Sequence, residues 1–241
     1  MKNTFINYNG RLLPKETFSW PPYSSGLLET MLWEEGRIAL WPYHAQRWRS
    51  SCKRLDYPSS ELSDRNLFDF ISETVKVNAL NTAARIRLCI FPFQQSLHFT
   101  IETFPYQIQE QIFRIGWSNQ KVNTTSIYSG LKTFPRTHYD LALEDAKKQQ
   151  WDDGLLLNER GRVAESAIAN IFYQQNNTLY TPPLSEGCVD GVYRRYILDH
   201  YPVIEKAISP EELLTADAVF LTNALRGKIK VAAIGAVQFP V

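Results

Sequence analysis

The chain has 241 residues, of which 44% are hydrophobic and 21% charged, a composition typical of a globular protein that buries a sizeable core. Its 26 basic and 25 acidic residues give a formal net charge of +1, so no strong overall field draws it to nucleic acid or to an anionic membrane. We therefore expect a small-molecule partner, with neither nucleic acid nor a membrane involved.

The first 16 residues lack the continuous apolar stretch of a secretory signal, and no segment approaches the ~20 apolar residues that span a bilayer. These absences predict a cytoplasmic protein. Cys52, Cys89 and Cys188 are widely scattered, with neither metal-ligand spacing nor a disulfide framework. We expect all three to be reduced packing residues and expect no metal site.

The first half of the chain reads mainly as strands with two helices. Alternating apolar residues around Asn9-Gly10 predict a β-hairpin, and residues 26–33 and 37–40 predict a second pair of strands with Gly36 in the turn. Helical spacing follows at 43–55 and 66–77, on helices expected to cover a sheet. That sheet gains strands at 85–91 and 97–104, and a further strand is expected at 113–117.

Residues 118–129 are polar and lose this periodicity, so we expect a boundary between two lobes there, at 1–118 and 119–241. Beyond it the pattern predicts a helix at 137–150, short alternating strands, and a helix at 192–200. A short helix after Ser209-Pro210 and a final strand at 218–222 complete the prediction.

Several separated segments of the chain contain residues suited to chemistry. They are His44-Ala45-Gln46-Arg47, Ser129-Gly130-Leu131-Lys132-Thr133, residues 163–172 around Glu165, residues 187–194 with Gly191-Val192-Tyr193, and residues 220–227 with Thr222-Asn223-Ala224. In this order and spacing they resemble the class IV, or fold-type IV, enzymes that depend on pyridoxal 5′-phosphate (PLP). This family includes branched-chain aminotransferases, D-amino-acid aminotransferases and 4-amino-4-deoxychorismate lyases.

The resemblance implies a mixed fold, α/β (α+β), with an N-terminal α/β sandwich and a C-terminal pseudo-barrel. It also implies PLP between the two lobes, and a homodimer in which the partner chain helps to close the site.

Lys132 corresponds to the Schiff-base lysine of the family. Its neutral amine can form an imine with the cofactor aldehyde and can later move protons. Most lysines are solvated surface charges, and by itself Lys132 would be assigned to them. Its place after Gly130, about thirty residues before the acidic motif, favours the catalytic interpretation.

Glu165 corresponds to the carboxylate that pairs with the pyridine nitrogen of PLP, where its charge keeps that nitrogen protonated. The alternative is a solvated glutamate at the end of a strand. Small and apolar residues surround Glu165 in the sequence, which predicts burial and hence the need for a partner.

The resemblance assigns the cofactor phosphate to Arg47 and to backbone amides at a helix start and a turn, near Val192-Tyr193 and Asn223-Ala224. The alternative for Arg47 is a solvent-facing arginine of an amphipathic helix, as we expect for Arg49 and Arg54. Aminotransferases of the family often have threonine where this chain has Tyr193, a difference that favours the lyase branch.

The resemblance also suggests Thr30, Arg87, Arg136 and Arg226 as substrate contacts. Glu29-Thr30-Met31 and Asn223-Ala224-Leu225 resemble the lyases, and Arg136 stands where lyases often have arginine. Arg136 can bind a substrate carboxylate or serve as a plain charge at a helix entry. Arg87 shares one face of its strand with Arg85, and that face can equally be solvated.

The resemblance to the lyase branch implies a 4-amino-4-deoxychorismate lyase that gives 4-aminobenzoate and pyruvate by Lys132-mediated elimination. Two alternatives stay open. One is a class IV aminotransferase that acts on branched-chain or D-amino acids, because the loop after Arg87 is shorter than usual and leaves the substrate undecided. The other is a non-catalytic protein that binds PLP or another ligand.

Overall fold

The computed structural model describes residues 4–21, 25–59, 62–80 and 82–240. The chain divides into two compact units, residues 1–108 with 132–135 and residues 109–131 with 136–241. The boundary expected after residue 118 falls inside the continuous strand β6 (Ile112–Val122). Residues 118–121 are polar because this part of the strand is at least partly exposed, so the polarity does not mark an end of the strand.

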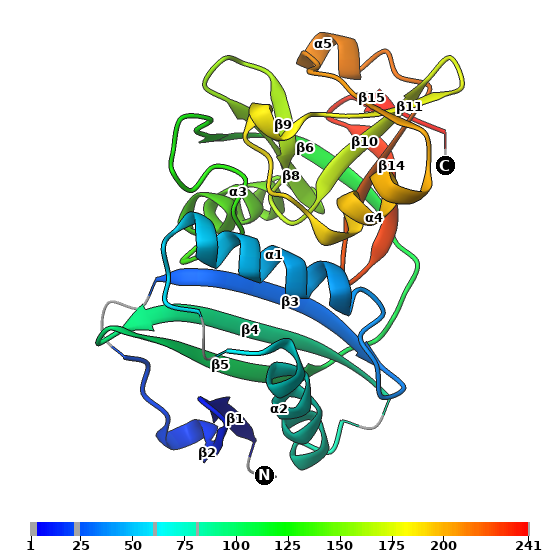
Figure 1. Cartoon of the computed structure of the whole chain (residues 1–241). Helices are drawn as coiled ribbons and strands as arrows, with labels where there is room; N and C mark the ends of the chain where they lie inside the picture. Colours follow the sequence, from blue (N-terminus) through cyan, green and yellow to red (C-terminus); the bar gives the residue numbers. More distant parts are fainter. Residues whose placement is uncertain (1–3, 22–24, 60–61, 81, 241) are drawn as a thin grey trace. The chain divides into compact units, whose positions relative to one another are not determined.

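The first unit is an antiparallel sheet with helices on one face. Its strands follow the order β2-β1-β5-β4-β3-β7 in the described part of the chain. They are β1 (Phe5–Tyr8), β2 (Arg11–Pro14), β3 (Gly26–Glu34), β4 (Ala83–Phe93), β5 (Ser96–Pro105) and β7 (Thr133–Phe134), with a short 3-10 helix at Lys15–Thr17. Helices α1 (Trp41–Arg54) and α2 (Asp64–Val77) pack on β3, β4 and β5 through one apolar core (Figure 1).

The predicted hairpin is confirmed, with Asn9 and Gly10 at φ 51° and 82° in the turn between β1 and β2. The helices and the strands β4 and β5 are confirmed as well. The predicted strand at 37–40 is wrong. Arg37 makes a single bridge to Glu34, after which Ile38 and Leu40 supply carbonyls to the first amides of α1. Pro42 favours this early helix start.

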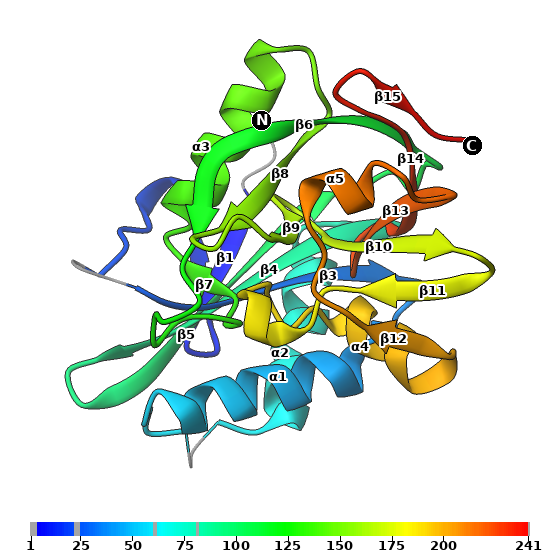
Figure 2. The same ribbon diagram turned by 90° about the horizontal axis from the view of Figure 1, so that it is seen from above.

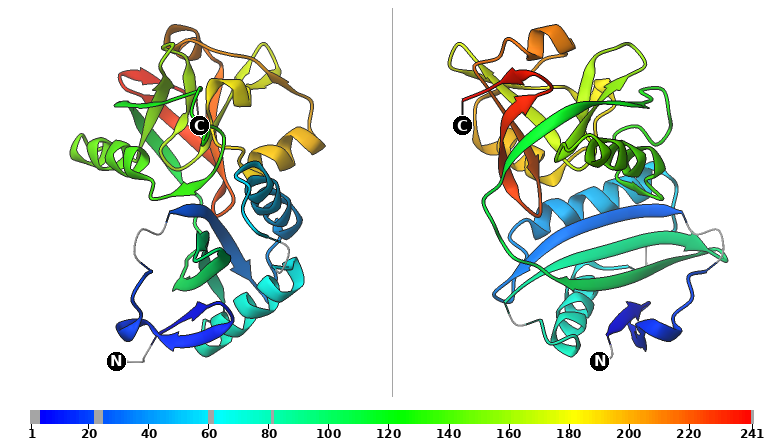
Figure 3. Two further views of the ribbon diagram at one scale, coloured as in Figure 1. Left: turned by 60° about the vertical axis from the view of Figure 1, so that its left-hand side comes forward. Right: turned by 180° about the vertical axis from the view of Figure 1, so that it is seen from behind.

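The second unit is a strongly curled sheet, as the arch of β6 shows in Figure 2. Its order among the described residues is β12-β11-β10-β13-β14-β6-β8-β9, with β15 beside β14. The strands after β6 are β8 (Asp153–Asn158), β9 (Val163–Ser166), β10 (Asn170–Gln175), β11 (Thr178–Thr181), β12 (Val203–Glu205), β13 (Ala218–Asn223), β14 (Gly227–Ile234) and β15 (Val237–Gln238). Seen from behind in Figure 3, β14 runs beside β6, to which it pairs in parallel.

Helices α3 (Thr137–Lys148), α4 (Val192–His200) and α5 (Pro210–Leu213) confirm the three helices predicted for this half, and a 3-10 turn lies at Leu184–Glu186. The strand predicted at 218–222 is present as β13, but it is not the last one. β14 and β15 follow it, because Gly227, at φ 67°, reverses the chain into a hairpin. Within the described residues, no helix is long and apolar enough to cross a membrane.

The expectation of a mixed α+β fold is therefore confirmed, with an antiparallel sheet covered by helices in one unit and a curled sheet in the other. The three cysteines are free and buried, as expected.

Candidate active site

In the first unit, Arg47 belongs to a buried ionic cluster with Glu29 and His44. Arg47 donates from Nε to Glu29 Oε1 at 2.8 Å and from Nη2 to Glu29 Oε2 at 2.5 Å. His44 Nδ1 lies 2.5 Å from the same Oε2. His44 and Arg47 are three residues apart on α1, so both face β3. Arg47 is only 6% exposed, which excludes the solvent-facing alternative.

The charges of this cluster stabilise one another. Burial alone would raise the pKa of Glu29, but the charge of Arg47 and the hydrogen bond of His44 outweigh it and lower that pKa to about 2. Burial lowers the pKa of His44, against the pull of Glu29. The Arg47 guanidinium is therefore fixed in place by a carboxylate that is charged at every ordinary pH.

Lys132 directly precedes β7 and is half-buried. Its carbonyl accepts a 2.8 Å hydrogen bond from the amide of Leu28, next to Glu29 on β3. The positive charge of Lys132 contributes to the lowered pKa of His44, so the lysine lies within electrostatic reach of the Glu29 cluster. Two of the predicted site residues, Lys132 and Arg47, thus belong to one charged region of the first unit.

Thr30 on β3 and Arg87 on β4 lie directly opposite each other in the sheet. The side chain of Arg87 is 45% exposed and lies 3.8 Å from Glu102, its neighbour on β5. Lys15 also pairs with Glu102, at 2.8 Å. Arg87 and Arg85 are both exposed, in agreement with the strand alternation, and the charge of Arg87 is engaged by a protein carboxylate.

In the second unit, Glu165 is buried on β9, 3% exposed, so the alternative of a solvated glutamate is wrong. Its Oε1 accepts hydrogen bonds from the Tyr139 hydroxyl at 2.6 Å and from the Val189 amide at 2.9 Å. Its Oε2 accepts one from Asn170 Nδ2 at 3.2 Å. These donors offset the cost of removing a carboxylate from water.

The start of α4 is built against the same residues. Asn170 Nδ2 also donates to the Val189 carbonyl at 2.8 Å, and its Oδ1 lies so close to Gly191 that a Cβ there would be 1.8 Å away. Gly191 is the N-cap of α4 and offers no side chain to the first amides, those of Val192 and Tyr193. No acidic residue lies in that first turn, so the positive end of the helix is available to an anion.

The turn between β13 and β14 lies beside this helix start. A Cβ on Gly227 would be 3.4 Å from the Tyr193 hydroxyl. Asn223 shapes the turn, because its Oδ1 accepts from the amides of Leu225 and Arg226 at 3.0 and 2.8 Å. The second unit therefore brings together the predicted segments around Glu165, Tyr193 and Asn223-Ala224.

The remaining predicted substrate contacts of this unit bond to protein groups. Arg226 donates from Nε to Gln111 Oε1 at 2.9 Å. Arg136 is the N-cap residue of α3 and donates from Nη2 to the Ala167 carbonyl at 2.6 Å. Its guanidinium also lies over the Tyr139 ring, 4.6 Å from the centroid.

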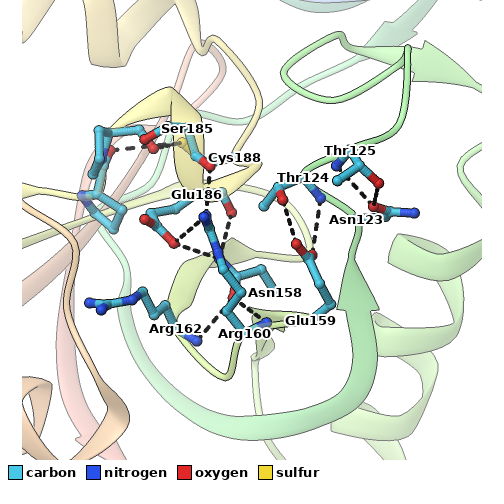
Figure 4. Close-up of polar contacts among 12 residues, drawn as sticks. Asn123, Thr124, Thr125, Asn158, Glu159, Arg160, Arg162, Ser185, Glu186 and Cys188 are labelled. Atoms are coloured by element: carbon cyan, nitrogen blue, oxygen red, sulfur yellow. Dashed lines mark hydrogen bonds and ion pairs between the residues drawn. The ribbon is translucent and has the colours of Figure 1, made fainter.

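A polar network drawn in Figure 4 fixes the segment that leads to Val189. Asn158 donates to the Glu186 carboxylate at 2.6 Å, and Arg160 bonds to the same carboxylate and to the Ser185 carbonyl, each at 2.9 Å. In the same turn, Glu159 accepts two hydrogen bonds from Thr124. The turn between β8 and β9 thereby holds loops from two distant parts of the chain.

Sequence reasoning missed Tyr139, Asn170 and the Val189 amide as partners of Glu165. Tyr139, Ala142 and Ala146 form the buried face of α3. A tyrosine on such a face needs a partner for its hydroxyl, which is the signal that could have identified it.

Comparison with known proteins agrees with the resemblance seen in the sequence. A relative named aminodeoxychorismate lyase, from Bacillus subtilis (strain 168), is 27% identical over 253 residues, covering 91% of this chain and 83% of the relative. A probable branched-chain-amino-acid aminotransferase of Thermotoga maritima is 27% identical over 172 residues, covering 68% of this chain and 62% of its own.

Among solved structures, a putative 4-amino-4-deoxychorismate lyase from Legionella pneumophila superposes with a TM-score of 0.85 at 26% identity, covering 94% of this chain and 91% of that one. The fold is thus that of the fold-type IV enzymes, as expected. The family model for amino-transferase class IV matches residues 26–234, so the chain belongs to the class IV aminotransferase family.

Proposed function

We propose that the protein is a PLP-dependent 4-amino-4-deoxychorismate lyase that releases 4-aminobenzoate and pyruvate. The observation that carries the proposal is the buried Glu165 carboxylate with its Tyr139, Val189 and Asn170 donors. A buried carboxyl group that accepts hydrogen bonds from three donors suits a protonated pyridine nitrogen. The choice of lyase rests on relatives of that name, at 27% and 26% identity.

The described residues include the chemical groups that PLP binding requires. Glu165 would face the pyridine nitrogen, and the uncapped amides of Val192 and Tyr193 suit a phosphate dianion, with the turn at Asn223-Ala224 beside them. Arg47, fixed by Glu29, would add a guanidinium to the phosphate.

PLP supplies an electron sink for charge that develops on the substrate carbon. Lys132 would hold the cofactor through its amine until the substrate amine displaces it. The free amine of Lys132 would then remove the proton from the amine-bearing ring carbon. The same group would return a proton to the methylene carbon of the departing enolpyruvyl group, which leaves as pyruvate. Aromatisation of the ring drives this elimination.

The direct test mixes purified, PLP-loaded protein with aminodeoxychorismate and follows 4-aminobenzoate. We expect equal amounts of 4-aminobenzoate and pyruvate from the wild type, none from Lys132→Ala, and an unchanged rate from Lys147→Ala, which removes an exposed lysine. Full PLP loading without any 4-aminobenzoate would contradict the lyase assignment.

An aminotransferase is the second candidate, favoured by the likeness to the Thermotoga maritima relative. In that case a panel of branched-chain and D-amino acids would convert the bound cofactor to its amine form and release keto acids. A non-catalytic PLP carrier would give neither product under the same conditions. Product analysis with both substrate sets therefore separates the three functions.

A further inference from the structure

Tyr139 and Glu165 form a buried hydrogen bond that the proposed chemistry does not yet use. The phenol oxygen lies 2.6 Å from Oε1 of Glu165, and the two residues are 9% and 3% exposed. Tyr139 comes from the first turn of α3, and Glu165 comes from β9. The contact therefore depends on the tertiary fold and links the helix to the strand.

Arg136 braces this contact from above the face of the Tyr139 ring. Its guanidinium carbon lies 4.6 Å from the centroid of the Tyr139 ring. Its Nη2 donates to the carbonyl of Ala167, two residues beyond Glu165, at 2.6 Å. One arginine thus contacts both the ring of the donor and the backbone of the segment that bears the acceptor.

The hydroxyl of Tyr139 is a dependable donor in this setting. Burial, together with the negative charge of Glu165, raises the pKa of Tyr139 well above its ordinary value, so the phenol keeps its proton. The neighbouring Cys188 thiol also stays neutral, because burial and the charge of Glu165 raise its pKa to about 12. Glu165 therefore meets a neutral donor and a neutral thiol rather than a competing anion.

We propose that Tyr139, braced by Arg136, is a positioning residue that keeps Glu165 ionised opposite the pyridine nitrogen of the cofactor. The inference rests on the proposed PLP chemistry and deepens it. In this proposal Arg136 holds Tyr139 and the segment after Glu165 in place and does not contact the substrate carboxylate.

Tyr139 acts by determining which of two groups carries a single proton, the Glu165 carboxyl group or the ring nitrogen. Burial favours a neutral carboxylic acid, and a basic carboxylate would draw the proton from the pyridinium. A hydrogen bond from the phenol stabilises the carboxylate anion, so the proton stays on the ring nitrogen. Without that bond the proton moves toward Glu165, and the ring becomes a weaker electron sink.

The test measures the ring nitrogen itself, by NMR of protein loaded with PLP labelled with nitrogen-15 at that position. Tyr139→Phe removes only the hydroxyl. Tyr173→Phe is the matched control, because Tyr173 is also buried in the second unit and its hydroxyl has no hydrogen-bond partner among the described residues. Thermal melting of both variants checks that they fold.

We expect the wild type and Tyr173→Phe to give the resonance of a protonated ring nitrogen, and Tyr139→Phe to move it downfield toward that of neutral pyridine. The same variant should lower kcat about tenfold or more, the usual effect of losing a hydrogen bond to a charged group, with little change in KM. A Tyr139→Phe resonance that coincides with the wild type would overturn the inference while leaving the proposed function intact.

The variant Arg136→Met, measured in the same NMR and kinetic experiments, tests the role of Arg136. A bracing role predicts a downfield shift like that of Tyr139→Phe, with KM nearly unchanged. A raised KM with an unshifted resonance would return Arg136 to the substrate and overturn its part of the inference. A folded wild type that takes up no PLP would overturn the proposed function itself.

Discussion

Arg47 donates hydrogen bonds to both oxygens of the buried Glu29 carboxylate, at 2.8 and 2.5 Å. Glu29→Gln would leave the guanidinium buried without its counter-charge. Breaking one partner of a buried pair typically costs about 3 kcal/mol of unfolding free energy. Urea denaturation should show this loss, whereas Glu35→Gln, at an exposed turn position, should match the wild type. Equal stability of the two variants would contradict the role given to this ion pair.

The same pair makes the stability of the protein depend on pH. In the fold the pKa of Glu29 is lowered from 4.5 to about 2, so its contribution is complete above about pH 5 and is lost as the pH falls toward 2. The lowered pKa of His44 acts in the same direction, since the unfolded chain takes up that proton first. The difference in urea midpoint between the wild type and Glu29→Gln should therefore be constant above about pH 5 and should shrink as the pH falls toward 2.

Asp153 shows the opposite dependence. Burial raises the pKa of Asp153 from 3.8 to about 6, against the hydrogen bond that the Gly154 amide donates to its Oδ1. The folded state therefore holds a proton that the unfolded chain releases, and stability is lost as the pH rises from about 4 to 6.

The wild type should lose up to roughly 3 kcal/mol of unfolding free energy from this group between pH 4 and pH 7. Asp153→Asn should not show this loss. The measurement is urea denaturation at both pH values. Asp69→Asn, on the exposed side of α2, serves as the control. If the pH profile of Asp153→Asn superposes on that of the wild type, Asp153 is not the cause of this loss of stability.

Gly191 leaves room for the Asn170 amide group. A Cβ at residue 191 would lie 1.8 Å from Asn170 Oδ1, so Gly191→Ala must displace the side chain that donates to Glu165 and to the Val189 carbonyl. We expect a loss of about 2 kcal/mol or more in stability and weaker PLP binding.

Gly161→Ala is the matched control, because Gly161 has a positive φ of 75° in open space and only backbone strain results, about 1 kcal/mol. Calorimetric melting and PLP titration of both variants would reveal the difference. Equal PLP affinities of the two variants would contradict the claim that a Cβ at residue 191 disturbs the cofactor site.

Local sequence signals predicted most of the fold. The alternation around Asn9-Gly10 and the periodicity of α1 and α2 each have a local cause, since side chains on one face meet one core. The strand predicted at 37–40 failed because Pro42 starts a helix whose first amides use the carbonyls of Ile38 and Leu40. β14 was missed although the exposed Lys228 and Lys230 alternate with the buried Ile229 and Val231, a pattern of period two that could have identified the strand.

The site was predicted in its residue types but not in its hydrogen bonds. The apolar sequence around Glu165 indicated burial, which the structure confirms. The donors to that carboxylate come from α3, β10 and the segment before α4, and no local pattern connects these segments. The engagement of Arg136 by the Ala167 carbonyl likewise depends on a contact across 31 residues of sequence.

The most direct test of the central claim is the attachment of PLP at Lys132. Purified protein is incubated with PLP, treated with borohydride, digested and mapped by mass spectrometry, with Lys132→Ala treated alongside. We predict one pyridoxyl-modified peptide, containing Lys132, and a visible absorbance that is absent from the variant. Modification at other lysines with Lys132 untouched, or no modification in a protein that binds PLP, would contradict it.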